Sequence, residues 1–152
     1  MTSTASPSAP VPPEAHSADP AHPTAEKIEG YLLSTRIAYE QANPTTWILR
    51  DADWQGAQIV VQNTEPLVVF RVKLLDLPQD LPDAKAAQLF RYLLELNSSE
   101  MLQGAYALEG NALVAVEVMQ SENLDQNEFL AAIDSLSLAI SEHRIGVLAR
   151  LA

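Results

Sequence analysis

The sequence predicts an α+β fold in which helices pack on a five-stranded antiparallel sheet, in the order α-β-β-β-α-β-β-α. Three observations predict it. Segments with helical periodicity alternate along the chain with segments in which every second residue is apolar. The turns between the period-two segments are short, and short turns join antiparallel strands. The chain of 152 residues is 47% hydrophobic and has no cysteine, so a hydrophobic core must stabilise it without disulfides.

Residues 1–23 differ in composition from the rest of the chain. They hold six of the ten prolines, and their only large apolar residues are Met1 and Val11. Such a segment buries too little apolar surface to offset the entropy of ordering, so we predict a disordered tail with polyproline II character. Residues 9–13 within it are either a ligand for a proline-binding domain or part of a plain linker. The folded domain is predicted over residues 24–152.

The first helix is predicted to begin at Thr24 and to end at Asn43-Pro44, because a residue before proline avoids the helical conformation. Three short strands follow, over residues 46–50, 57–62 and 67–74. The third has the clearest alternation, with Arg71 and Lys73 on the face opposite to its large apolar residues. The apolar positions that predict the helix and this strand are Ile28, Tyr31, Leu32, Thr35 and Tyr39, then Val68, Phe70, Val72 and Leu74.

The second half of the chain is predicted to be a helix, a hairpin and a final helix. Pro82 is suited to the first position of the second helix, which ends near residues 97–99. The hairpin strands, residues 104–109 and 112–118, are joined by a Gly110-Asn111 turn. Asp125 and Glu128 form a capping arrangement for a helix that runs from Asn127 nearly to the C-terminus.

No catalytic or metal-binding motif is present in the sequence. The three histidines, His16, His22 and His143, are far apart and have no ligand spacing around them. There is no G-x-S-x-G, no G-x-G-x-x-G and no phosphate-binding loop. The prediction is a protein without catalytic residues, metal or cofactor. A hydrolase or transferase with an unrecognised site remains the competing hypothesis, and a deep polar pocket would favour it.

The net charge of −11 argues against direct binding to nucleic acid or to an anionic membrane. No secretory signal and no long apolar run occur, so the expected location is the cytoplasm. Between Tyr92 and His143 there is no lysine or arginine, whereas nine acids lie there. This stretch is either a solvated face or an acidic surface that steers a basic partner, such as a basic nucleic-acid-binding protein.

The last helix is apolar around more of its circumference than one packed stripe requires. Leu138, Ile145 and Leu148 extend onto a second side, which predicts either a homodimer interface or deeper burial in the same domain. The second helix is also a candidate for the dimer interface. Trp54, beside Gln55-Gly56, is expected to be partly exposed and to contact a partner.

The segments 93–97, 104–108 and 110–114, followed by the acidic helix start at Asp125, resemble the YbjN-like family. That family is similar in fold to type III secretion chaperones of the Tir-chaperone type. The resemblance implies a small, acidic, dimeric α+β protein without catalysis. It also implies a partly extended client segment held on apolar patches.

On the sheet face that no helix covers, we expect Leu113, Ala115 and Val69 to contact such a segment. Two functions follow from these observations. The first is a chaperone-like adaptor that binds another protein. The alternative is a regulatory dimer whose acidic face binds a basic nucleic-acid-binding protein.

Overall fold

The computed structural model describes residues 22–152, so nearly all of the predicted tail lies outside the described residues. The helices are α1 (His22–Leu33), α2 (Asp83–Ser99), α3 (Gln126–Leu138) and α4 (Arg144–Leu151), with a π-helical turn (Ala139–His143) between the last two. The strands are β1 (Ala38–Asn43), β2 (Thr46–Arg50), β3 (Ile59–Thr64), β4 (Leu67–Asp76), β5 (Ala105–Glu109) and β6 (Ala112–Gln120). A 3-10 turn (Ala52–Trp54) separates β2 from β3.

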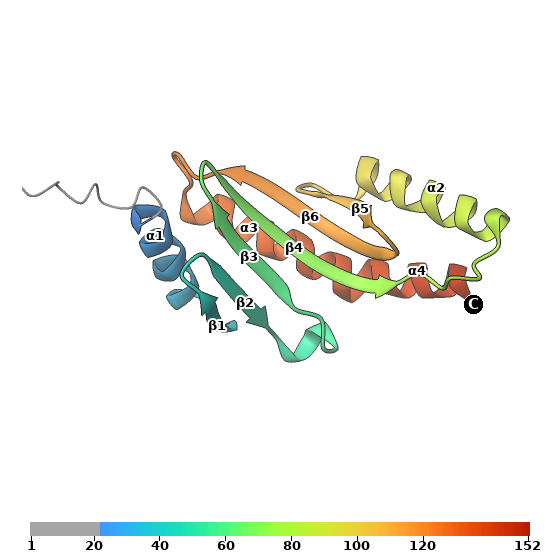
Figure 1. The fold of residues 1–152 in the computed structure, drawn as a ribbon, viewed down its shortest axis with the longest axis horizontal. Coiled ribbons are helices and arrows are strands. Elements are labelled where there is room, and N and C mark those ends of the chain that lie inside the picture. Colours follow the sequence, from blue (N-terminus) through green and yellow to red (C-terminus); the bar gives the residue numbers. More distant parts are fainter. Residues whose placement is uncertain (1–21) are drawn as a thin grey trace, which may run out of the picture.

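Within the described chain, the strands form a single sheet of six strands in the order β1-β2-β3-β4-β6-β5, with every neighbouring pair antiparallel. Figure 1 shows the long strands β4 and β6 in the middle of this sheet, with α3 and α4 along one face of it. The α+β class is therefore confirmed. The predicted count of five strands is wrong, because the sequence analysis missed β1 and the order is α-β-β-β-β-α-β-β-α.

The sequence predicts helix over the residues that form β1, because Tyr39 continues the helical spacing of Tyr31 and Thr35. In the structure the helix ends at Leu33. Ser34 Oγ donates to the carbonyl of Tyr31 at 2.6 Å, and Thr35 Oγ1 donates to the carbonyl of Leu32 at 2.8 Å. These hydroxyl groups donate to carbonyls in the last turn of the helix. Such hydrogen bonds compete with the backbone hydrogen bonds that would extend the helix. Tyr39 lies in β1 and pairs with Leu49 of β2.

The predicted N-terminus of the last helix is confirmed by its capping box. The backbone N–H of Glu128 donates to Asp125 Oδ1 at 2.8 Å, and the N–H of Asp125 donates to the Glu128 carboxylate at 3.4 Å. The predicted single helix is instead interrupted by the π-helical turn. At α2, Pro82 occupies the N-cap position, one residue before the predicted one.

The core lies between one face of the sheet and the helices. Along β4, Val68, Phe70 and Val72 have no exposed surface. The ring of Phe70 meets that of Phe129 from α3 edge-on, with centroids 5.1 Å apart. Val72 pairs with Ala115 of β6, so these two side chains share a face.

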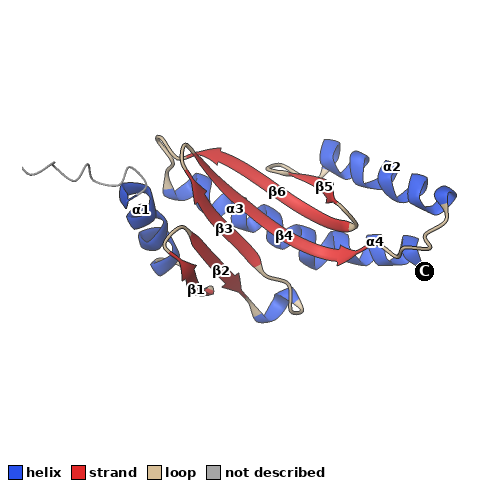
Figure 2. Ribbon diagram, in the orientation of Figure 1, coloured by secondary structure: helices blue, strands red, loops and turns tan. Residues whose placement is uncertain are grey.

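The register between β4 and β6 corrects one prediction. Leu113 and Ala115 were expected on the uncovered face, but both have no exposed surface and belong to the core cluster. Val114, Val116 and Val118 point the other way, on the same face as Arg71 and Lys73. None of the described helices covers that second face, which Figure 2 shows as bare strands. We call it the open face.

The different burial of two paired leucines predicts their effects on stability. Leu113 is fully buried, whereas its cross-strand partner Leu108 is 44% exposed. Replacing Leu113 with Ala should lower the free energy of unfolding by about 2–5 kcal/mol. Leu108→Ala should cost less than about 1 kcal/mol because little packing is lost. Urea unfolding of both variants measures this, and equal losses would contradict the different burial of the two side chains.

Candidate functional site

An apolar stripe crosses the middle of the open face. Ile48 pairs with Val60 across β2 and β3, and Val69 pairs with Val118 across β4 and β6. Arg71 pairs with both Val60 and Val116, so the stripe steps diagonally from Val60 to Val69 past this arginine. Val118 is 48% exposed, and the other side chains are half-buried between their neighbours. Partly exposed apolar side chains gathered on one face are typical of a site that contacts another molecule. Its members are Ile48, Val60, Val69, Val116 and Val118.

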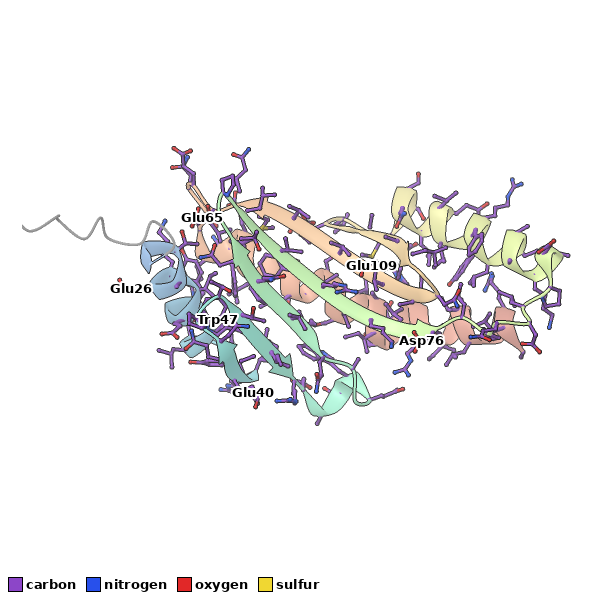
Figure 3. All side chains as sticks on the ribbon, in the orientation of Figure 1. Glu26, Glu40, Trp47, Glu65, Asp76 and Glu109 are labelled. Atoms are coloured by element: carbon purple, nitrogen blue, oxygen red, sulfur yellow. The ribbon has the colours of Figure 1, made fainter. Side chains whose placement is uncertain are left out.

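Ion pairs flank the stripe and balance its charge. Each basic side chain of the open face, on β2 or β4, pairs with a carboxylate from β1, β4 or β5. These pairs are partly exposed, so each contributes about 1 kcal/mol or less to stability. Figure 3 shows where the three carboxylates lie on the strands. The pairs are Arg50–Glu40 at 3.2 Å, Lys73–Asp76 at 2.8 Å, and Arg71–Glu109.

The charges of this face are balanced, whereas the chain as a whole has a net charge of −11. Because β6 lies between β4 and β5, the Arg71–Glu109 pair spans β6. Val114, on the same face of β6, has no exposed surface. Beside the stripe, Gly56, Gln58 and Lys73 line a hollow of about 350 Å³. The open face thus combines apolar side chains with basic residues whose charges are paired, Arg71 among them at its centre.

The strand β1 forms a free edge of the sheet. It pairs with β2 on one side, and the other side is the end of the strand order in the described chain. All of its side chains except Tyr39 are exposed. Backbone N–H and C=O groups along such an edge can pair with an added strand.

Trp54, predicted to be partly exposed, is only 4% exposed and belongs to the core. The side chain of Asp51 accepts a hydrogen bond from the Asp53 N–H at 2.9 Å and caps the 3-10 turn. Gln55 and Gly56 both have positive φ. This turn geometry directs the indole inward, so the expected contact of Trp54 with a partner is wrong for this structure.

The other predicted site residues are exposed to different degrees. Val69 lies on the open face, as expected, and is half-buried. Ile145 is 68% and Leu148 49% exposed, whereas Leu138 is half-buried. Deeper burial of the last helix in its own domain is therefore excluded for Ile145 and Leu148.

Most of the stripe does not follow from the sequence. A strand over residues 112–118 is predicted, but both of its faces are apolar, so the pattern does not show that Val116 and Val118 lie on the surface. One pattern in the sequence could have located the stripe. Val69 alternates with the same period as Arg71 and Lys73, and these two basic residues indicate the outer face of β4. The edge strand β1 had no comparable signal, because its residues AYEQAN have little apolar alternation.

Titratable groups also occur in the core. The Tyr106 hydroxyl lies 2.6 Å from His143 Nδ1, and both residues are buried. Burial lowers the pKa of His143, although Glu100 and Glu142 act in the opposite direction. Burial likewise raises the pKa of Tyr106 and that of Glu117. The pair joins β5 to the π-helical turn, which is a packing role.

At the opposite end of the sheet, Glu65 joins three elements. Ser121 Oγ donates to its carboxylate at 2.6 Å, and Thr24 of α1 also bonds to it. These two hydrogen bonds lower the pKa of Glu65. Among the described residues, no group of three His, Asp or Glu side chains could hold a metal ion. No described helix is long and apolar enough to cross a membrane.

This fold, with its open sheet face, is that of a chaperone-like class of protein. The chain belongs to the CesT_Tir_1 family, whose model matches residues 21–151. The family is non-catalytic, which confirms the prediction that the chain is not an enzyme. No curated protein matches the chain.

Several solved structures have a similar fold. A chain of the heterodimeric ExoU–SpcU complex from the type III secretion system of Pseudomonas aeruginosa is 23% identical, with a TM-score of 0.58. The match covers 82% of this chain and 97% of that one. YbjN from E. coli is 12% identical, with a TM-score of 0.56, over 80% of this chain and 92% of that one.

A chain of the HopA1–SchA chaperone–effector complex is 11% identical, with a TM-score of 0.52, over 80% of this chain and 94% of that one. The predicted resemblance to YbjN and to type III secretion chaperones is therefore confirmed at the level of fold.

The buried His143 predicts a specific pH dependence of stability. Because its pKa is lower in the folded than in the unfolded protein, the unfolded chain binds a proton first as pH falls below the ordinary value of 6.5. The contribution of neutral His143 to the free energy of unfolding should thus be present above that pH and lost as the pH falls below it. His143→Gln keeps an acceptor for Tyr106 but removes the titration. Thermal unfolding from neutral to mildly acidic pH should give a shallower slope for the variant, and parallel slopes would refute this role.

Proposed function

We propose that this protein is a non-catalytic, chaperone-like adaptor that binds an extended segment of another protein on the open face. The observation that supports it is the apolar stripe, where Val118 stays 48% exposed in a face that no described helix covers. Burying such side chains under a partner removes apolar surface from water, and this is the main favourable contribution to protein association. The adjoining edge of β1 would add backbone hydrogen bonds to the same segment.

The charge balance of the open face supports an extended client of mixed sequence. Arg50, Arg71 and Lys73 are each paired with a carboxylate, so the face exerts little net attraction on either sign of charge. Side chains of an extended client alternate, so every second residue would lie on the stripe and the others would face solvent. Specificity would then come from the spacing of apolar residues in the client.

Two proteins of similar fold support this proposal. One belongs to the heterodimeric ExoU–SpcU complex, and the other belongs to the HopA1–SchA chaperone–effector complex. In both cases a protein of similar fold was crystallised with another protein. At these identities the likeness concerns the fold alone, so the client of this chain has to be identified directly.

A charged substitution on the open face should separate binding from folding. Val118→Glu would place a carboxylate against the apolar part of the client and should weaken binding about tenfold, since burying an unpaired charge is costly. The melting temperature should change little because Val118 is half-exposed. Affinity capture with quantitative mass spectrometry on wild-type and variant baits identifies the client. Titration of its isolated segment then gives the affinity.

Leu33→Glu supplies the matched control for that experiment. Leu33 is 73% exposed on α1, away from the open face, so the same change there should leave client capture unchanged. Equal capture by the wild-type and Val118→Glu baits would refute the open face as the binding surface.

We also propose a homodimer, formed through the exposed apolar side of the last helix at Leu138, Ile145 and Leu148. The exposure of Ile145 and Leu148 supports this interface. A competing interface lies between α2 and β5, where Leu94 is 68% exposed beside a hollow of about 250 Å³.

The two interfaces predict different variants that dissociate the dimer. At tens of micromolar, light scattering after size exclusion should give the mass of two chains for the wild type and of one chain for Ile145→Glu. Leu94→Glu should remain dimeric. Dissociation by Leu94→Glu alone would move the interface to α2, and a single-chain mass for the wild type would refute the dimer.

A further inference from the structure

A further hollow with apolar walls lies between α3 and the segment that leads from α2 to β5. It has a volume of about 340 Å³, enough for a large apolar side chain. Leu102, Ala131 and Leu138 give it apolar walls. Leu102 is 93% exposed, the largest exposed fraction among the large hydrophobic residues of the described chain. This hollow is separate from the open face, because α3 covers the opposite side of the sheet.

The structure holds the exposed leucine in place. On one side of it Met101 is buried, with 8% exposure. On the other, the Gln103 carbonyl accepts a hydrogen bond from Ser135 Oγ of α3 at 2.6 Å. Gly104 follows with φ of +81°, and a Cβ there would lie 2.7 Å from the Val116 carbonyl oxygen. The segment is thus anchored on both sides of Leu102, and the leucine remains at the rim of the hollow.

The charged groups around the hollow are all of one sign. Glu100 and Asp134 line it, and both are exposed. Its whole lining comes from residues 100–138, and the sequence contains no lysine or arginine between Tyr92 and His143. The hollow therefore differs from the open face, where each cation has an acidic partner. A ligand here meets apolar walls and unopposed carboxylates.

A polar atom in the lining also lacks a partner. Gln103 Oε1 is buried and accepts no hydrogen bond from the part of the chain that the structure describes. A buried acceptor without a donor costs free energy, so a donor supplied by a ligand would be stabilising there. Lysine, arginine and backbone N–H groups are such donors.

We propose that this hollow binds a basic amphipathic segment of a partner protein, in which a large apolar side chain is flanked by lysine or arginine. The apolar side chain would pack against Leu102 and Leu138, and the flanking cations would face Glu100 and Asp134. The charge complementarity selects this occupant over an acidic or neutral segment. The proposal goes beyond the adaptor function and does not depend on the open face. Leu138 also belongs to the proposed dimer interface, so the Ile145→Glu variant, which should be a single chain, is tested with the same probe and should bind it at least as tightly as the wild type.

Fluorescence anisotropy with designed peptides and the full-length protein tests the proposal. The probe is a fluorescein-labelled peptide of lysine and leucine in an amphipathic arrangement. One matched peptide has glutamate in place of every lysine, and another has serine in place of every leucine. The first probe should bind, and both matched peptides should bind at least about tenfold more weakly. Raising the salt concentration should also weaken binding, because the contacts between charges are exposed.

Variants of the hollow show whether the probe binds there. Leu102→Ser should raise the Kd about tenfold, which is the effect of losing one buried leucine contact. Asp134→Asn should raise it about threefold and reduce its salt dependence. Both side chains are exposed, so the melting temperature should stay unchanged. Leu33→Ser and Glu122→Gln are matched controls at exposed positions outside the hollow, and they should bind the probe as the wild type does.

Three results would overturn the proposal. One is a Kd that Leu102→Ser leaves unchanged, since the probe would then bind through general attraction to an acidic protein. Another is equal binding of the serine-substituted peptide, which would show that no apolar side chain enters the hollow. A loss of probe affinity in Val118→Glu with none in Leu102→Ser would also refute it, because binding would then occur on the open face.

Discussion

The antiparallel pairing of β4 with β6 is the constraint on which the rest of the structure depends. It joins the meander β1–β4 to the hairpin β5–β6, two parts of the sheet that α2 separates in sequence. The register pairs Val72 with Ala115, and a slip by one residue would reverse every side chain of β6 between the two faces. Arg71 and Lys73 exclude one face of β4 from the core, because unpaired charges are costly to bury. The face of β6 that is buried therefore follows from β4.

Once this face is buried under α3, the two sides of the molecule acquire different chemistry. The open face retains a stripe of valine and isoleucine between paired charges. On the helix side, Glu100 and Asp134 line a hollow whose lining contains no cation. An extended segment and a basic amphipathic segment would thus find different sites on one chain. The physical reason is that the basic residues of the open face are paired with acids on β1, β4 and β5, whereas no basic residue lines the hollow.

Two hydrogen-bonded polar groups connect elements of the fold. Tyr106 and His143 satisfy each other across the junction of β5 with the π-helical turn. Glu65 accepts hydrogen bonds where α1 meets the β3–β4 turn and the end of β6. Both arrangements link elements that are distant in sequence. The groups with shifted pKa values, Glu65, Tyr106 and His143, therefore connect elements of the fold. This structural role agrees with a family that performs no catalysis.

The sequence by itself determined the α+β class, most of the helices and strands, the capping box at Asp125, the absence of catalytic motifs and the family resemblance. These follow from local patterns, since periodicity, capping and turn residues act within a few positions of the chain. Only the tertiary structure decided that Tyr39 lies in a strand, that Leu113 and Trp54 are buried, and that Leu102 lines a hollow. Both faces of β6 are apolar, and a local pattern cannot show which of them a distant helix covers. Burial and pocket geometry depend on contacts between segments far apart in sequence, so they become defined when those segments pack.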